Sequence, residues 1–166
     1  MRFYLKGVKI FKPEMKTICC ERDFVADICD NLDFFCEITQ RAPVKTVRRE
    51  AQIHTMMLTK QTFPMWFVHR FKLKRADLFL EHEDGSYSVI EAKFLKAKYD
   101  EFDVLGGLTQ AMYYSCLLAP MNLNLTAYVV ANRVPEIFGG LVEHYNLKGI
   151  GFVQWTEGDC WYRGLR

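Results

Sequence analysis

The strongest constraint on the fold is the dipeptide Asp84-Gly85, which lies between two runs of apolar and β-branched residues. The first run extends from about Ala76 to His82, and the second extends from Tyr87 to Leu95. Asp-Gly between two such runs is a strong local signal for a β-hairpin, since these residues suit the turn that joins antiparallel strands. A loop with an odd number of residues then places Asp77 directly opposite Glu91. The sequence therefore predicts a hairpin that carries two facing carboxylates.

These carboxylates would share one face of the hairpin with a lysine. Side chains alternate along a strand, so Glu91 and Lys93 point the same way. Directly opposed residues have Cβ atoms roughly 5 Å apart, and two carboxylates that close repel unless a cation or a proton lies between them. A hard cation such as Mg²⁺ or Mn²⁺ meets that need. Lys93 could orient a water molecule or neutralise charge growing on a phosphate.

The competing interpretation is an ordinary hairpin face covered by water, which is the better explanation of an E-x-K triplet taken alone. However, this triplet lies within the largely apolar run Val89-Ile90-Glu91-Ala92-Lys93-Phe94-Leu95. Charges in such a strand are costly unless they are paired or bound to a metal. The surroundings therefore favour a functional site.

A helix is predicted after this strand, from about Val104 to Leu118. Its apolar residues recur at helical spacing and indicate one face, made of Leu105, Leu108, Met112 and Cys116. Gln110 and Tyr114 are four residues apart and share a different face.

Asp77, Glu91-x-Lys93 and Gln110-x-x-x-Tyr114, in this order, resemble the motifs of the PD-(D/E)XK nuclease superfamily, in particular its RecB-like and lambda-exonuclease-like branch. The resemblance implies an α/β (α+β) restriction-endonuclease-like core, with a central mixed sheet flanked by helices in the order α-β-β-β-α-β. It implies Mg²⁺-dependent hydrolysis of DNA, with Mn²⁺ as a substitute. Asp77, Glu91 and the Ala92 carbonyl would hold the metal. Lys93, Gln110 and Tyr114 would complete the catalytic set.

Members of this superfamily often carry another acidic residue on a helix before the first core strand. Pro43 is in a favoured first-turn position for a helix over about Val44 to Leu58. Glu50 is the only acidic residue in that range, which makes it a candidate metal ligand. A salt bridge with a neighbouring Arg or Lys of the same helix explains Glu50 equally well.

Positive charge is concentrated ahead of the acidic hairpin. The net charge is only +2, yet residues 41–75 hold nine Lys or Arg residues and a single acid. A phosphate backbone approaching a metal site would need such a basic flank, although a solvated basic surface is the alternative. The predicted nucleic-acid-binding residues are Arg48, Arg49, Lys74 and Arg75.

Length and composition favour a single domain over residues 1–166. The resemblance covers about residues 44–131, with an N-terminal arm and helix over 1–40 and a C-terminal strand and tail over 132–166. The other expected helices are Glu21 to Ile38 and Pro135 to Tyr145. The other expected strands are Phe3 to Phe11, Met65 to Leu73, Leu123 to Ala131 and Gly149 to Trp155, with an edge strand over Cys160 to Arg163.

No apolar run is long enough to span a membrane, and the N-terminus lacks a signal-peptide pattern. The six cysteines show no zinc-ligand spacing. Several of them lie on predicted apolar helix faces, so we expect reduced thiols in an intracellular, cytoplasmic protein. A minimal nuclease of this kind suits a virus or mobile element, where the cytoplasm is that of the host cell. Association with a second copy or with a partner protein stays open. Two other functions also stay open: a nucleic-acid-binding module of the same fold that does not cut, and an unrelated α/β protein-interaction domain.

Overall fold

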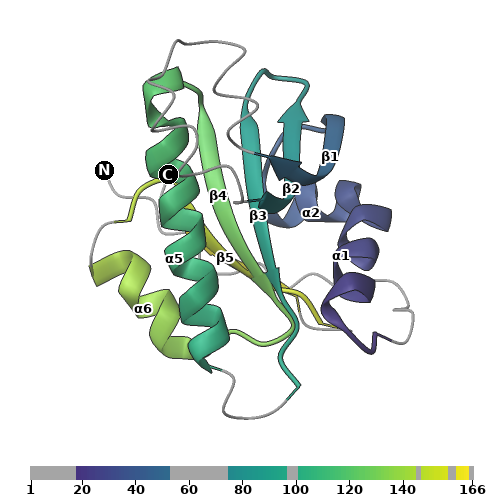
Figure 1. Cartoon of the computed structure of the whole chain (residues 1–166), viewed down its shortest axis with the longest axis vertical. Helices are drawn as coiled ribbons and strands as arrows, with labels where there is room; N and C mark the ends of the chain where they lie inside the picture. Colours follow the sequence, from purple (N-terminus) through teal and green to yellow (C-terminus); the bar gives the residue numbers. More distant parts are fainter. Residues whose placement is uncertain (1–17, 53–74, 97–100, 145–146, 157–159, 165–166) are drawn as a thin grey trace.

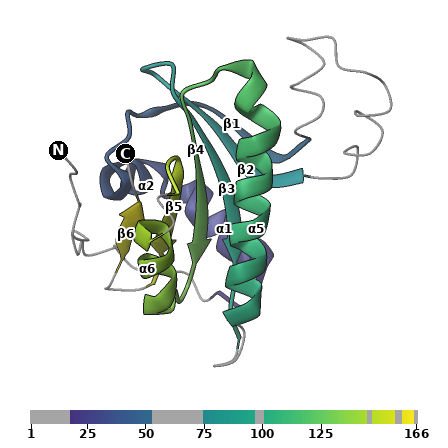
Figure 2. The same cartoon turned by 90° about the vertical axis from the view of Figure 1, so that its left-hand side faces the viewer.

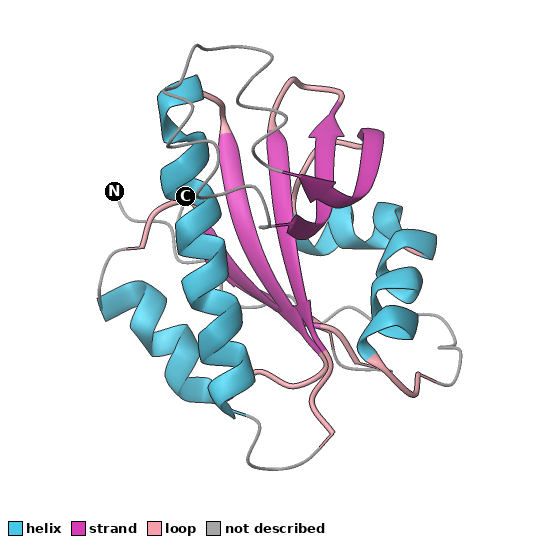
Figure 3. Ribbon diagram, in the orientation of Figure 1, coloured by secondary structure: helices cyan, strands magenta, loops and turns pink. Residues whose placement is uncertain are grey.

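The computed structural model describes residues 18–52, 75–96, 101–144, 147–156 and 160–164. Within these ranges, a six-stranded sheet is covered by helices on both faces (Figures 1 and 2). Figure 3 separates the two kinds of element by colour and shows the strands between two pairs of helices. The site described below lies within these three layers.

The strands occur in the sheet in the same order as in the sequence. They are β1 (Val44–Gln52), β2 (Arg75–His82), β3 (Tyr87–Lys93), β4 (Leu125–Ala131), β5 (Ile150–Gln154) and β6 (Trp161–Gly164). β1, β2 and β3 are antiparallel to one another, β3, β4 and β5 are parallel, and β6 is antiparallel to β5. The predicted mixed sheet is therefore confirmed.

The helices connect and cover the parallel strands. Parallel neighbours need a crossover connection, and α5 (Glu101–Leu118) and α6 (Glu136–His144) provide those from β3 to β4 and from β4 to β5. Both helices pack on one face of the sheet, while α1 (Glu21–Asp30) and α2 (Leu32–Thr39) pack on the other. A short 3₁₀ helix, η1 (Ala119–Met121), follows α5. Among the described residues, no helix has the length and apolar character that crossing a membrane requires.

The predicted hairpin is present, and the pairing of Glu81 with Tyr87 leaves an odd number of residues in its loop, as expected. Leu78 pairs with Ile90, and the same register extended by one residue sets Asp77 opposite Glu91. The turn closes with a hydrogen bond from the His82 N–H to the Ser86 carbonyl (2.9 Å). Gly85 has a φ of +77°, which few residues other than glycine adopt. The Asp84-Gly85 signal was therefore interpreted correctly.

The predicted helix over Val44 to Leu58 is wrong where the structure describes it, because residues 44–52 form β1. β1 pairs with β2 over seven residue pairs, from Val44 with His82 to Gln52 with Arg75. This long-range ladder outweighs the weak local signal of Pro43, which immediately precedes the strand. The order α-β-β-β-α-β holds, but with α1 and α2 as its helix and β1 as its first strand. The predicted strands Phe3 to Phe11 and Met65 to Leu73 lie outside the described residues, as does the remainder of the predicted helix.

The single helix predicted over Glu21 to Ile38 is in fact two helices, with a break at Asn31. Asn31 has a non-helical φ of −127°, and its side-chain amide donates a hydrogen bond to the Asp27 carbonyl (2.8 Å). Asparagine readily satisfies the backbone in this way, which is why it interrupts helices. The break lets α1 and α2 take different directions across the sheet.

The sequence also placed the packed face of α5 incorrectly. Leu108 is buried, whereas Leu105, Met112 and Cys116 are exposed. The face that meets the sheet consists of Val104, Gly107, Leu108, Ala111, Tyr114, Leu117 and Leu118. Small residues at 107 and 111 bring the helix close to β3 and β4, and this approach directs Tyr114 toward the acidic hairpin.

Candidate active site

The site forms where β2 begins and β3 ends. The last β2–β3 pair toward this end is Leu78 with Ile90. Beyond it, the Ala92 N–H donates a hydrogen bond to Asp77 Oδ2 (2.7 Å). A side-chain carboxylate thus takes the place of a backbone acceptor at the end of the ladder. This bond fixes Asp77 beside the strand that carries Glu91 and Lys93.

Glu91 points into the interface between the sheet and α5 and is only 3% exposed. Its Oε1 forms an ion pair with Lys93 Nζ (2.8 Å), and its Oε2 lies 3.3 Å from the Tyr114 hydroxyl. That hydroxyl also donates a hydrogen bond to the Arg75 carbonyl (2.7 Å), and it is hydrogen-bonded to the Gln110 side chain. The structure thus brings Gln110 and Tyr114 together with the E-x-K triplet, as their order in the sequence predicted.

Gly107 is part of this arrangement, and the sequence analysis missed it. A Cβ atom at this position would lie 3.0 Å from Val129 Cγ1 and 3.2 Å from Lys93 Cγ. Glycine in a helix interior is unfavourable by itself, so its position facing the Lys93 side chain indicates a need for close approach. The signal was a Gly-Gly pair inside an otherwise regular helix.

Burial and like charge dominate the electrostatics. Burial, together with the nearby charge of Glu91, raises the pKa of Asp77 to about 7. Burial also raises the pKa of Glu91, although Lys93 and Tyr114 partly oppose the change. Burial alone would lower the pKa of Lys93, but its ion pair with Glu91 outweighs that effect and raises it. At neutral pH, the buried Glu91 is therefore paired with Lys93, while the half-buried Asp77 is only partly ionised.

A cavity of about 350 Å³ opens beside Asp77, between α1 and β1. It is lined by Glu21, Arg22, Val25, Arg49, Glu50 and Asp77. Glu50 reaches it from a strand and not from a helix, with a φ of +48° that is unusual for a residue other than glycine. Its predicted helical setting is wrong, yet it lies at the predicted site.

Glu21, the first residue of α1, is a further acid of this cavity that the sequence analysis missed. Its charge contributes to raising the pKa of Asp77, Glu91 and Lys93. The criterion used for Glu50, an acid on the helix before the first core strand, would have pointed to the helices over residues 21–39, but it could not have chosen Glu21 from the several acids that they carry.

The predicted basic residues are distributed around the site. Arg48 and Arg49 are exposed on β1, and Arg75 is exposed at the start of β2, opposite Gln52. Lys74 lies outside the described residues. Within the described ranges, no three His, Cys, Asp or Glu side chains gather closely enough to hold a metal ion by themselves.

Comparison with solved structures finds a similar fold in the crystal structure of a repair endonuclease from Pyrococcus abyssi. The TM-score is 0.52 and the sequence identity is 18%, and the match covers 87% of this chain and 50% of that chain. The chain thus spans half the length of that protein. No family model matches the sequence, and no curated protein matches it either.

The fold is therefore restriction-endonuclease-like, as the sequence predicted, and the match shows the fold alone. It does not distinguish the RecB-like branch from other branches.

Proposed function

We propose that the protein is a metal-dependent nuclease that hydrolyses phosphodiester bonds in DNA. The observation that carries this proposal is a pair of carboxylates, the half-buried Asp77 and the buried Glu91, opposed on adjacent strands with raised pKa values beside Lys93. Perturbed groups of this kind cluster at functional sites. Similarity to a repair endonuclease in fold supports the same conclusion.

The donor atoms suit a hard divalent cation. Asp77 and Glu91 offer carboxylate oxygens, which Mg²⁺ and Mn²⁺ prefer. The N–H and C=O of a strand residue point to the same edge of the strand. Since the Ala92 N–H points to Asp77, the Ala92 carbonyl faces the same edge and could add a ligand. Glu50 and Glu21 could contribute from the neighbouring cavity. The bound metal would lower the pKa of a water molecule and stabilise charge on the phosphate.

The residues around this pair have separate roles in the proposal. Lys93 keeps its proton, because its pKa is raised, so it would act as a positive charge near the phosphate and not as a general base. Tyr114 and Gln110 are positioning residues that hold Glu91 from α5. The Tyr114 hydroxyl also ties Glu91 to the start of β2 through the Arg75 carbonyl.

DNA would approach along the basic flank. Arg48, Arg49 and Arg75 are exposed, and Arg49 lines the cavity that contains Asp77. Neutralising phosphates with such residues would make binding strongly dependent on salt. Lys74 precedes Arg75 in the sequence and completes the proposed set.

Cleavage of a mixed panel of nucleic acids tests the proposal. The panel contains linear duplex, circular single-stranded DNA, a flap and RNA, each with Mg²⁺, with Mn²⁺ or with EDTA. We expect cleavage of DNA only with metal, and a loss of at least about 100-fold in Glu91→Gln. Glu81→Gln is the matched control, since it removes an acid of β2 that pairs with Lys45 (2.9 Å) at the surface. Cleavage that survives EDTA or Glu91→Gln would refute the proposal.

A nucleic-acid-binding module that does not cut is the second candidate. It is favoured by one observation: both carboxylate oxygens of Glu91 already contact protein groups, Lys93 and Tyr114. If this closed arrangement persists with metal present, the protein would bind nucleic acid at low salt without cleaving any panel member. In that case, Arg49→Gln would weaken binding, and Glu91→Gln would leave it unchanged or strengthen it.

A further inference from the structure

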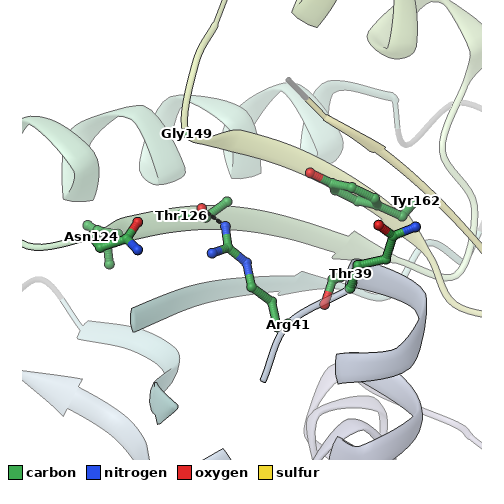
Figure 4. Close-up of a pocket in the computed structure, with 8 residues that line it drawn as sticks. Thr39, Arg41, Asn124, Thr126, Gly149 and Tyr162 are labelled. Carbon is green, nitrogen blue, oxygen red and sulfur yellow. Dashed lines mark hydrogen bonds between the residues drawn. The ribbon is translucent and has the colours of Figure 1, made fainter. Parts of the chain in front are cut away.

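A second cavity, of about 440 Å³, lies away from the carboxylates (Figure 4). It lies between the end of α2, the start of β4 and the start of β5, and its walls include Thr39, Arg41, Asn124, Thr126, Gly149 and Tyr162. Glu91 pairs with Val129, and Thr126 is three residues earlier, or about 10 Å along β4. Tyr128 packs with the α1–α2 side of the sheet, whereas Val129 packs with the α5 side. The two sites are therefore separate.

Among the described residues that line this cavity, Arg41 is the only charged one. Its Nε donates a hydrogen bond to the Tyr128 hydroxyl (2.8 Å), and one terminal nitrogen donates to the Thr126 hydroxyl. Its guanidinium carbon lies 6.0 Å from the centre of the Tyr128 ring. These contacts orient the group, but all of them are with neutral partners.

The guanidinium has unused capacity. Arginine carries five N–H donors, and the two hydrogen bonds above account for two of them. No carboxylate among the described residues lies within ion-pair distance of Arg41. The charge of Arg41 acts on Asp84, an exposed acid of the hairpin turn, but the two form no ion pair. A half-buried cation whose described side-chain partners are all hydroxyl groups favours the binding of an anion from outside.

The other described residues of the wall are mostly polar, with Leu125 as the apolar exception, and none of them is an acid. Figure 4 shows the guanidinium between Asn124 on one side and Thr39 and Tyr162 on the other. At the end of α2, the Cys36 carbonyl accepts a hydrogen bond from the backbone N–H of Arg41 (2.9 Å) and therefore does not need the guanidinium as a donor. Gly149 contributes only backbone atoms to the wall. Its φ of +74° is one that residues with a side chain rarely adopt.

We propose that this cavity binds a phosphate monoester of about the size of a mononucleotide. Arginine matches the geometry of phosphate oxygens with paired N–H donors. Hydroxyl and amide groups from Thr126 and Asn124 can bond the remaining oxygens, and Tyr162 and Leu125 offer less polar walls for the rest of the molecule. The volume lies in the range of about 300–1,000 Å³ common for small-molecule sites. The phosphate can belong to a free nucleotide or to the 5′ end of a strand.

Calorimetric titration of the full chain in EDTA tests this site without the metal-dependent activity. The probes are deoxyadenosine 5′-monophosphate, unphosphorylated deoxyadenosine, inorganic phosphate and a short 5′-phosphorylated oligonucleotide. Asn124→Asp places a negative charge at the exposed edge of the cavity with almost no change in shape. Thr109→Glu is its control, because it adds the same charge on the exposed surface of α5, across the sheet.

We expect the monophosphate to bind to the wild type and deoxyadenosine not to bind. Asn124→Asp should weaken binding about tenfold or more, which corresponds to a repulsion of about 1.4 kcal/mol, whereas Thr109→Glu should not weaken it. Arg41→Gln should also abolish binding. If that variant unfolds because it loses contacts with Tyr128 and Thr126, Asn124→Asp still provides the test.

The oligonucleotide separates the two sources of phosphate. If Asn124→Asp weakens binding of the oligonucleotide as much as binding of the monophosphate, the ligand is the 5′ end of a strand. If it weakens binding of the monophosphate alone, the ligand is a free nucleotide. The proposal is overturned if no phosphate probe binds, or if Asn124→Asp binds like the wild type. Glu91→Gln should leave the monophosphate titration unchanged, so a failure to bind monophosphate would not bear on the proposed nuclease.

Discussion

Polar groups are buried at both ends of the β2–β3 hairpin, but they have different kinds of partner at each end. At the turn, His82 is 1% exposed, and its two ring nitrogens contact the Ala42 carbonyl and the Ser88 hydroxyl, each at 2.7 Å. A carbonyl only accepts, so Nδ1 carries the hydrogen, and Nε2 accepts from Ser88. Every polar atom of this ring therefore has a neutral partner.

At the open end, the same two strands oppose the carboxylates of Asp77 and Glu91. Burial lowers the pKa of His82 and keeps it neutral, whereas burial and the Glu91 charge raise the pKa of Asp77 to about 7. A buried polar group with complementary partners stabilises the fold, while like charges held together lower stability unless something else binds. We therefore expect substitutions at the two ends to have opposite effects on stability and activity.

Asp77→Asn should have the largest effect. Cleavage should fall about 10³-fold, because removing a metal-holding charge costs several kcal/mol in the transition state. The metal-free protein should gain about 1 to 3 kcal/mol of stability near pH 8, where ionised Asp77 is unfavourable. Single-turnover cleavage and urea unfolding in EDTA measure the two changes. Loss of both activity and stability would mean that Asp77 is only structural.

Tyr114→Phe should have the next largest effect. The Tyr114 hydroxyl joins Glu91 to the Arg75 carbonyl, and removing a group that orients a metal ligand typically costs about 10- to 100-fold in activity or metal affinity. Stability should fall by about 0.5–1.5 kcal/mol, since the part-buried hydrogen bond to the Arg75 carbonyl is lost.

Tyr113→Phe is the control for this change, because it removes a hydroxyl from the adjacent position on α5. Cleavage rates and Mg²⁺ titrations should separate the two variants. Equal activity of Tyr114→Phe and Tyr113→Phe would show that the tyrosine does not position Glu91.

The response to pH should distinguish the two ends by its sign. The folded pKa of Asp77 is raised from 3.8 to about 7, so its contribution to stability is lost as pH rises through about 7. The folded pKa of His82 is lowered from 6.5, so its contribution is lost as pH falls below 6.5. Below about pH 7, the two groups therefore drive metal-free stability in opposite directions: Asp77 makes it fall as pH rises from about 4 to 7, and His82 makes it rise toward pH 6.5.

Urea midpoints in EDTA from about pH 5 to pH 8.5 would show this curve through proton linkage. Asp77→Asn should remove the fall in stability that Asp77 causes as pH rises to about 7, and Mg²⁺ should stabilise the wild type most above pH 7, where Asp77 is ionised. A stability difference between wild type and Asp77→Asn that stays constant from about pH 5 to pH 8.5 would contradict the raised pKa of Asp77.

The same hairpin explains what the sequence could predict. Asp84-Gly85 fixes a local turn and its register, so the opposition of Asp77 and Glu91 follows from residues close in the chain. The spacing of Gln110 and Tyr114 likewise lies within one helix. Local chemistry was sufficient for these parts of the site.

The errors occur where distant contacts decide. β1 takes its strand conformation because it pairs with β2, from which residues 53–74 separate it in the sequence. The local sequence of β1 does not indicate that partner. Glu50 was assigned to a helix for this reason, and Glu21 was missed. The exposed apolar residues of α5, such as Leu105 and Met112, also misdirected the choice of its packed face.

Ser88→Ala, at the turn end, should have the smallest effect and completes the comparison. It removes the hydroxyl that donates to His82 Nε2, which should cost about 1 kcal/mol of stability, the usual net value of a hydrogen bond. Cleavage at saturating Mg²⁺ should stay within about twofold of wild type, because the serine touches no group of the proposed site. Unfolding by urea and cleavage of duplex DNA measure both quantities. A tenfold loss of cleavage in this variant would mean that the two ends of the hairpin are coupled, and the contrast between a structural end and a functional end would fail.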